Sequence, residues 1–247
     1  NDVFADIVNV LLFHGNRIVK EESLKETMVK SQYKAEAGKL LEQERDVAKY
    51  WQEGNALVAI CGLENQTVEE KYMPLRVFSY DGASYRRQLL PGNDKNPIVP
   101  VVSLVLHFGM KEWSSPHNLK GVIDIPKELE PYVNDYKANI FNIAFLDDET
   151  VQMFQSDFRI VADFFVQKRK NKDYVPDEHK IKHVDEMLKL LQVLTGDDRY
   201  NVKFSETEKE DGVKMCDVME KAVAEERINS IKVLVSSLEE FGISSEA

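Results

Sequence analysis

Apolar residues recur at helical spacing near the start of the chain. Residues 2–13 predict an amphipathic helix, and its apolar positions are spaced at i, i+3, i+4 and i+7: Phe4, Ile7, Val8 and Leu11. Asp2, Asp6 and Asn9 lie on the other face of this helix. A Gly-Asn pair at 15–16 is typical of a helix end.

Short apolar runs with β-branched members predict strands further along the chain. Residues 56–63 and 98–108 read as buried strands, and residues 136–145 alternate well enough to form a third. Residues 44–52 suit either a helix end or a strand that turns at the Glu-Gly-Asn sequence after it. Between the two buried strands, residues 73–90 predict a helix with a proline in its first turn.

The last part of the chain has a helical pattern throughout. Three helices are predicted there: 149–170, 178–195 and 213–241. Asp147 and Asp148 are alternative caps for the first of them, and Gly196 should stop the second. The third carries an apolar stripe: Cys216, Met219, Val223, Ile228, Ile231, Val235 and Leu238.

The order of these elements predicts the fold class. One helix, a few strands with a helix between them, and a run of helices together indicate an α/β core with a helical C-terminal extension. We place the core at residues 1–172 and the extension at residues 173–247. The charge is also divided in this way, because the extension has a net charge of −8 and the core only −3.

Composition narrows the classes of function. The net charge of −11 disfavours a generic nucleic-acid coat protein or a basic membrane binder, although an enzyme that acts on DNA needs only a local basic patch. No apolar run reaches the ~18 residues of a membrane span, so we expect no membrane association. Cys61 and Cys216 are far apart and form no metal-binding motif, which suits buried thiols in a reducing compartment and a cytoplasmic protein.

Polar residues at the end of a predicted strand are the first candidates for chemistry. Glu64 and Gln66 follow the strand at 56–63 and share one of its faces, because side chains on a strand alternate. If residues 45–51 form a strand paired with it, Asp46 and Glu64 can come together as an all-oxygen site that suits Mg²⁺. The other readings remain open: the start of a solvated loop for Glu64 and Gln66, and an exposed position on a charged helix for Asp46.

Several segments, taken in order, resemble a bacterial family. It is the family of PD-(D/E)XK nuclease family transposases, also described as Rpn-type recombination-promoting nucleases and putative transposases. The segments that carry the resemblance are FADIVNVLLFHG at 4–15, ERDVAKYW at 44–51, VAICGLENQT at 58–67, MPLRVFSYDGASY at 73–85, VPVVSLVLHFGMKEW at 99–113 and LKLLQVLTGDDRY at 188–200. The resemblance implies a restriction-endonuclease-like core, in which a central mixed sheet is flanked by helices.

The resemblance also implies roles for individual residues. Asp46 matches the first acid of the family's motif, Glu64 matches the metal-binding acid, and Gln66 stands where most of the superfamily has lysine. Asp6 is the best match for an acid on the first helix that completes the site, with Asp2 as a competitor. The implied cofactor is Mg²⁺ or Mn²⁺. The chain departs from the pattern at Gln66, and it also has Arg45 where proline precedes the first acid.

Two functions follow as expectations. The first is a metal-dependent DNA endonuclease of the transposase type, in which Arg76, Arg86 and Arg87 on the predicted helix at 73–90 contact DNA phosphates, unless they are only solvated positions. The second is a catalytically weak or inactive module on the same fold that binds DNA or protein. In either case the apolar stripe of the last helix suits a homo-oligomer interface.

Overall fold

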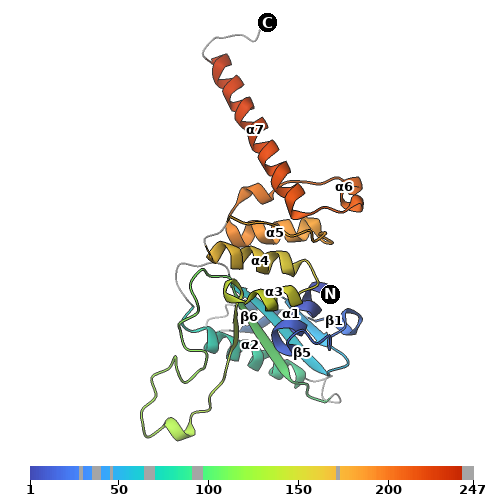
Figure 1. Ribbon diagram of the computed structural model, residues 1–247. Helices are drawn as coiled ribbons and strands as arrows, with labels where there is room; N and C mark the ends of the chain where they lie inside the picture. The colour runs from blue at the N-terminus through green and yellow to red at the C-terminus, as the bar shows by residue number, and fades with distance from the viewer. Residues whose placement is uncertain are drawn as a thin grey trace. The chain divides into compact units, whose positions relative to one another are not determined.

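The computed structural model describes residues 1–27, 30–34, 40–44, 47–63, 70–90, 97–170 and 173–240 (Figure 1). The chain divides into two compact units, Asn1–Asp173 and Tyr174–Ala247. The first unit is built on a five-stranded sheet and the second, where it is described, is largely helical.

A mixed sheet forms the centre of the first unit. Its strands, in spatial order, are β1 (Leu24–Glu26), β4 (Val47–Trp51), β5 (Ala56–Leu63), β6 (Val101–His107) and β7 (Asn139–Asn142). β4 is antiparallel to both β1 and β5, whereas β5, β6 and β7 run parallel. A separate two-stranded sheet is made by β2 (Lys30–Lys34) and β3 (Leu40–Glu44).

The ambiguous segment at 44–52 ends in a strand. β4 and β5 form a hairpin in which Val47 pairs with Ile60 and Trp51 pairs with Ala56. Asn55 closes the turn with a φ of 45°, a left-handed conformation that asparagine tolerates better than most residues. The Tyr50 hydroxyl donates to Asn55 Oδ1 at 2.6 Å, which holds the turn in place.

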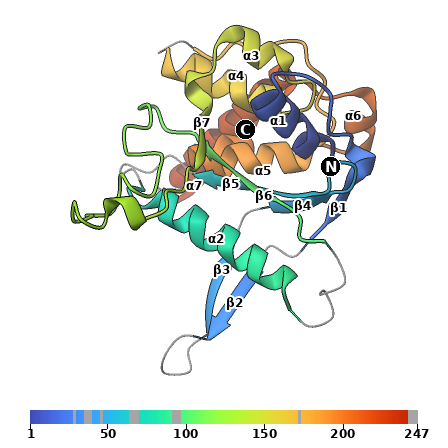
Figure 2. The same cartoon turned by 90° about the horizontal axis from the view of Figure 1, so that it is seen from below.

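Helix α2 (Met73–Gln88) connects β5 to β6 and covers one face of the sheet. Met73 and Val77 pack against Val105 of β6 in a fully buried cluster. Figure 2 shows α2 on one side of the sheet and α1 (Asp2–Phe13), α3 (Asp148–Met153) and α4 (Phe158–Arg169) on the other. The predicted strands at 56–63 and 98–108 and the helix at 73–90 are therefore confirmed as parts of one α/β layered core. The strand predicted over 136–145 is shorter, because β7 covers only Asn139–Asn142 and Ile143–Phe145 forms a 3-10 helix.

Helix α1 is buried on more sides than its amphipathic pattern suggests. Every residue from Phe4 to Val10 is buried, including Asp6 and Asn9 on the face predicted to be polar. Asn9 is satisfied because its Nδ2 donates to the Val19 carbonyl and its Oδ1 accepts from the Val19 N–H, both at 2.8 Å. Asn9 thus binds protein backbone instead of water.

The single helix predicted over 149–170 is wrong, because the structure has two helices there. α3 ends before Phe154, whose backbone is extended, and α4 starts at Phe158. Asp147, and not Asp148, caps α3 by accepting from the Thr150 N–H at 2.6 Å. The break between α3 and α4 depends on a distant residue, because the backbone N–H groups of Gln155 and Ser156 donate to the Asp6 side chain of α1.

The second unit contains α5 (Val184–Thr195), a short 3-10 helix at Asp198–Tyr200, α6 (Glu206–Asp211) and α7 (Met215–Glu240). α5 begins six residues later than predicted, because the chain before it pairs with the segment ahead of α7: the Ile181 N–H donates to the Val213 carbonyl at 2.8 Å. α5 stops at Gly196, which has a φ of 67°. The pattern predicted α7 almost to its ends.

The architecture is that of a restriction-endonuclease-like α/β fold with a helical C-terminal region. Among the helices that the structure describes, none combines the length and the apolar character needed to cross a membrane.

Candidate active site

Three predicted site residues, Asp46, Glu64 and Gln66, lie outside the described residues. Asp46 and Glu64 each adjoin a described strand residue. Asp46 directly precedes Val47, the first residue of β4, and Glu64 directly follows Leu63, the last residue of β5. Because β4 and β5 are antiparallel, the start of one strand and the end of the other lie at the same end of the hairpin.

Parallel strands end next to each other at this edge of the sheet. Leu63 is in register with His107 of β6, which is in register with Asn142 of β7. Ligands of open α/β sheets bind outside the carboxyl ends of such strands. The edge that leads into Glu64 is therefore a suitable place for a site.

His107 and Asn142 organise the loop that leaves this edge. His107 is buried, its Nε2 hydrogen-bonds with the Lys111 carbonyl at 3.1 Å, and its ring meets Trp113 edge-on at 5.3 Å. Asn142 Oδ1 accepts from the backbone N–H of Trp113 at 3.0 Å. This loop needs glycine at position 109, because a Cβ on that residue would lie 2.4 Å from Nε2 of the His107 ring. These contacts make His107 a packed histidine of the sheet edge, and the role of Asn142 carries no signal in the sequence.

Asp6 is buried among hydrogen-bond donors. One carboxylate oxygen pairs with the Arg17 guanidinium, and the other accepts from the backbone N–H groups of Gln155 and Ser156 at 2.9 and 2.7 Å. Arg17 also donates to the Met153 carbonyl. Both oxygens of Asp6 therefore hold α1 against the turn between α3 and α4. No group of three or more His, Cys, Asp or Glu side chains that could hold a metal ion occurs within the part of the chain that the structure describes.

A second buried carboxylate lies on α2 itself, on the side that faces the sheet. Asp81, only 2% exposed, accepts from the Ser103 hydroxyl of β6 at 2.6 Å and from the Tyr136 hydroxyl. The backbone carbonyl of Ser103 in turn accepts from Asn139 Nδ2 at 3.1 Å. This network fixes α2 and the start of β7 on β6, and sequence reasoning missed it because each residue is unremarkable in its local pattern.

The three predicted DNA-contacting arginines all lie on α2 but differ in their surroundings. Arg76 forms an ion pair with Glu70 at 3.0 Å and donates to the Tyr80 hydroxyl at 3.0 Å. Arg87 is half-buried, whereas Arg86 is exposed and makes no ion pair with another residue in the described ranges. Arg86 is thus the most available of the three for a phosphate.

Comparison with known families identifies the chain. A family model described as "Putative transposase, YhgA-like" matches residues 50–200, which is 151 of the 247 residues. The chain belongs to this family. The YhgA-like putative transposases are the Rpn-like group of PD-(D/E)XK proteins, so the resemblance found in the sequence is confirmed.

The family match includes some of the candidate residues and not others. Glu64, Gln66 and the arginines of α2 lie within residues 50–200, whereas Asp46 and Asp6 precede that range. No curated protein and no solved structure was found to match the chain.

Proposed function

We propose that this YhgA-like putative transposase is a divalent-metal-dependent DNA endonuclease that hydrolyses phosphodiester bonds. One relationship in the sheet supports this function: β4 begins and β5 ends on the same side of their hairpin. Asp46 is joined to the first residue of β4 and Glu64 to the last residue of β5. The pairing therefore favours two carboxylates at one edge of the sheet, as the family's motif requires.

The donor set fits a hard divalent cation. Asp46 and Glu64 offer carboxylate oxygens and Gln66 offers a carboxamide oxygen, which are the ligands that Mg²⁺ and Mn²⁺ favour. A bound ion of this kind lowers the pKa of a coordinated water and offsets the charge that develops on phosphate. Gln66 would hold the attacking water through a hydrogen bond and would not take up its proton, because a carboxamide does not titrate.

The contacts of Asp6 favour a positioning role over direct metal binding. Its oxygens already bind Arg17 and two backbone N–H groups, and a metal would have to displace donors from a buried carboxylate. We therefore propose that Asp46 and Glu64 provide the metal-binding carboxylates and that Asp6 supports the helices behind them.

DNA is the proposed substrate, and the exposed Arg86 of α2 is the proposed first contact with its backbone. Arg76 and Arg87 are eleven positions apart, so they lie on one face of the helix about three turns apart. Phosphate contacts of this kind position DNA without reading its sequence.

Cleavage of supercoiled plasmid tests the function. We expect nicking that requires Mg²⁺ or Mn²⁺, stops with EDTA, and falls about 100-fold or more in Glu64→Gln. Glu128→Gln, which changes an exposed acid in the same unit, should retain the wild-type rate. Equal activity in Glu64→Gln and wild type would contradict the proposed site.

A non-catalytic module on the same fold is the second candidate, and the observation that favours it is Gln66 at the position usually held by lysine. DNA binding by the wild type and by Glu64→Gln, without cleavage by either, would support this alternative and would contradict the nuclease.

A further inference from the structure

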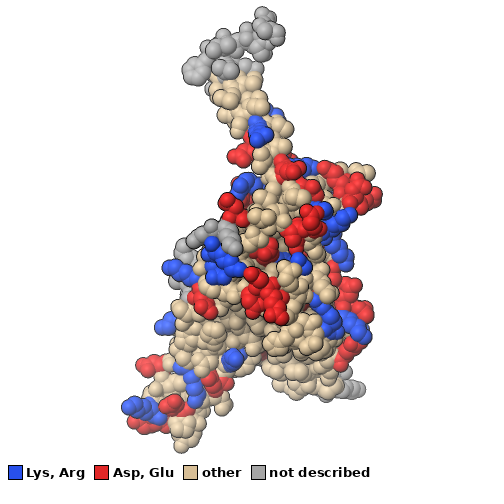
Figure 3. All heavy atoms as spheres, viewed as in Figure 1, with Lys and Arg blue, Asp and Glu red and all other residues tan. Residues whose placement is uncertain are grey.

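Helix α7 leaves a long apolar segment without cover from its own unit. Its beginning is anchored, since Met215, Val218 and Ala222 are buried, but every residue from Val223 to Ser236 is exposed. Six of these exposed residues are large and apolar: Val223, Ile228, Ile231, Val233, Leu234 and Val235. Figure 3 shows the outer part of α7 as mostly uncharged surface. Exposed apolar surface of this extent marks an interaction site.

One face of α7 has the spacing of a helix-pairing seam. Ala224, Ile228, Ile231 and Val235 are separated by four, three and four residues, the a/d spacing of a coiled coil. Ile228 is 51% exposed and Ile231 is 60% exposed, although such positions are normally covered by another helix. This seam, defined by these four residues, therefore fits a helix with the same spacing.

We propose that the seam binds α7 of a second copy of this chain, in antiparallel orientation about a two-fold axis. The charges beside the seam support a second copy as the occupant. With Ile228 of one copy opposite Ile231 of the other, Glu225 lies within about one turn of Lys232 of the second copy, on the same flank. The two-fold axis repeats this pair, so each copy supplies one acid and one base.

Other orientations and partners fit the charges less well. In a parallel pair Arg227 would lie opposite Lys232 of the second copy, and like charges at these positions repel. DNA does not suit the surface, because Glu225 and Glu226 stand beside the seam.

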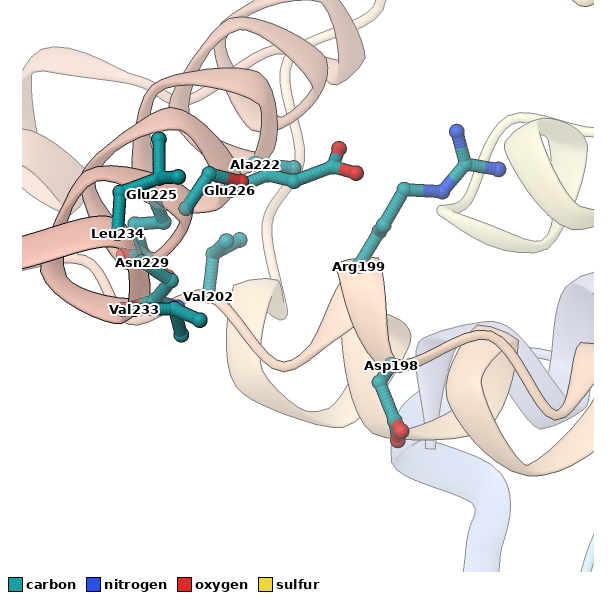
Figure 4. A pocket seen from close by; sticks show the side chains of 10 residues that line it. Asp198, Arg199, Val202, Ala222, Glu225, Glu226, Asn229, Val233 and Leu234 are labelled. Carbon is teal, nitrogen blue, oxygen red and sulfur yellow. The ribbon is translucent and has the colours of Figure 1, made fainter. Parts of the chain in front are cut away.

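The opposite side of α7 provides a matched control. There α7 and the 3-10 helix at Asp198–Tyr200 line an open pocket of 580 Å³ (Figure 4). Val233 lines this pocket, is 63% exposed, and lies about 160° around the helix from Ile231. Val233→Glu therefore introduces the same carboxylate as Ile231→Glu into the same helix, but on the side away from the seam.

The molecular mass of the full chain in solution tests the interface. Light scattering or sedimentation equilibrium should show a dimer for wild type and for Val233→Glu, and Ile231→Glu should raise the dimer dissociation constant at least about 100-fold, because a buried carboxylate would face an apolar partner. A wild-type monomer at every concentration would overturn the proposal. Equal dissociation constants for Ile231→Glu and Val233→Glu would also overturn it, and would point to another face or partner.

A charge exchange tests the antiparallel pairing itself. Glu225→Lys and Lys232→Glu should each weaken the dimer about tenfold, because each brings like charges together. The double variant should return to near the wild-type dissociation constant, since both pairs are restored with reversed sign. If the double variant is as weak as the single ones, Glu225 does not face Lys232 and the proposed pairing is wrong. All these positions are exposed in the single chain, so helix content by circular dichroism should stay constant.

Discussion

The carboxylate of Asp6 accepts a hydrogen bond at 2.7 Å from the backbone N–H of Ser156, a residue 150 positions later in the chain. Gln155 donates to the same oxygen, and Arg17 pairs with the other one. The turn between α3 and α4 thus finds its hydrogen-bond acceptor on α1. An acid on the first helix has a structural task here that its place in the sequence does not reveal.

Replacing Asp6 by asparagine should destabilise the first unit. The asparagine amide keeps the shape of the carboxylate but loses the charge that pairs with Arg17. Its NH₂ group would also face an N–H donor where a carboxylate oxygen now accepts a hydrogen bond. We expect a loss of about 2–3 kcal/mol in the free energy of unfolding. Denaturant titration with tryptophan fluorescence measures this, because Trp51 and Trp113 both belong to that unit.

The exposed acid Glu22 provides the control. The free energy of unfolding of Glu22→Gln should lie within about 0.5 kcal/mol of the wild-type value. Wild-type stability of Asp6→Asn together with lost plasmid cleavage would contradict the positioning role and would favour Asp6 as a metal ligand.

The neighbouring acids Asp147 and Asp148 should differ in their effect on stability. Asp147 accepts from the Thr150 backbone N–H at 2.6 Å, and this bond lowers the pKa of its carboxyl. Asp147→Ala should therefore lower the Tm by about 2–4 °C, as expected for loss of a helix cap. Asp148 is exposed and pairs with Lys170 at the surface, so Asp148→Ala should leave the Tm nearly unchanged. Equal shifts for the two variants would contradict the assignment of the cap.

The capping box of α6 should make the second unit sensitive to acid. The backbone N–H and hydroxyl of Ser205 and the ammonium of Lys221 lower the pKa of Glu208 to about 2, from an ordinary value of 4.5. Because the folded pKa is the lower one, this contribution is present above about pH 5 and is lost as the pH falls towards 2.

The side-chain carboxyl resonance of Glu208 in an NMR titration reads this pKa directly. We expect a midpoint near 2. In Glu208→Gln, the Tm should change less with pH than in wild type between about pH 5 and 2. A midpoint near 4.5 would show that Glu208 does not make these bonds in solution.

Arg86 should contribute to DNA affinity without affecting sequence preference. Removing one phosphate contact should weaken binding at low salt and reduce the slope of log affinity against log salt by about 1. Fluorescence anisotropy with duplex DNA at several salt concentrations measures both effects for Arg86→Ala. Lys127→Ala removes an exposed positive charge elsewhere in the unit and should leave the slope unchanged; equal slopes for wild type and Arg86→Ala would exclude the contact.

Hydrophobic periodicity predicted the elements whose apolar residues follow a regular strand or helix spacing. The run at 56–63 is β5, and the helix at 73–90 is α2 with its proline in the first turn. The polar segment at 20–45 gave no such signal, although it contains β1, β2 and β3. β1 is an edge strand and β2 with β3 forms its own small sheet, so these strands lack the apolar alternation of a core sheet.

Long-range contacts explain what the sequence could not predict. The break between α3 and α4 depends on Asp6, and the burial of Asp81 depends on Ser103 and Tyr136, which come from other elements. Such pairs follow from the fold and have no local pattern. Asp46, Glu64 and Gln66 came instead from spacing around one hairpin and from a family resemblance, and the hairpin is confirmed while the roles of the three residues remain predictions.

The proposed nuclease site requires that Asp46 and Glu64 hold one metal ion together. Titration with Mn²⁺, followed by electron paramagnetic resonance of the free ion, measures this in wild type, Asp46→Asn, Glu64→Gln and the double variant. We predict that each single change weakens the same tight site at least about tenfold, and that the double change removes no further site. Mn²⁺ binding that is unchanged by either single change would contradict the shared site.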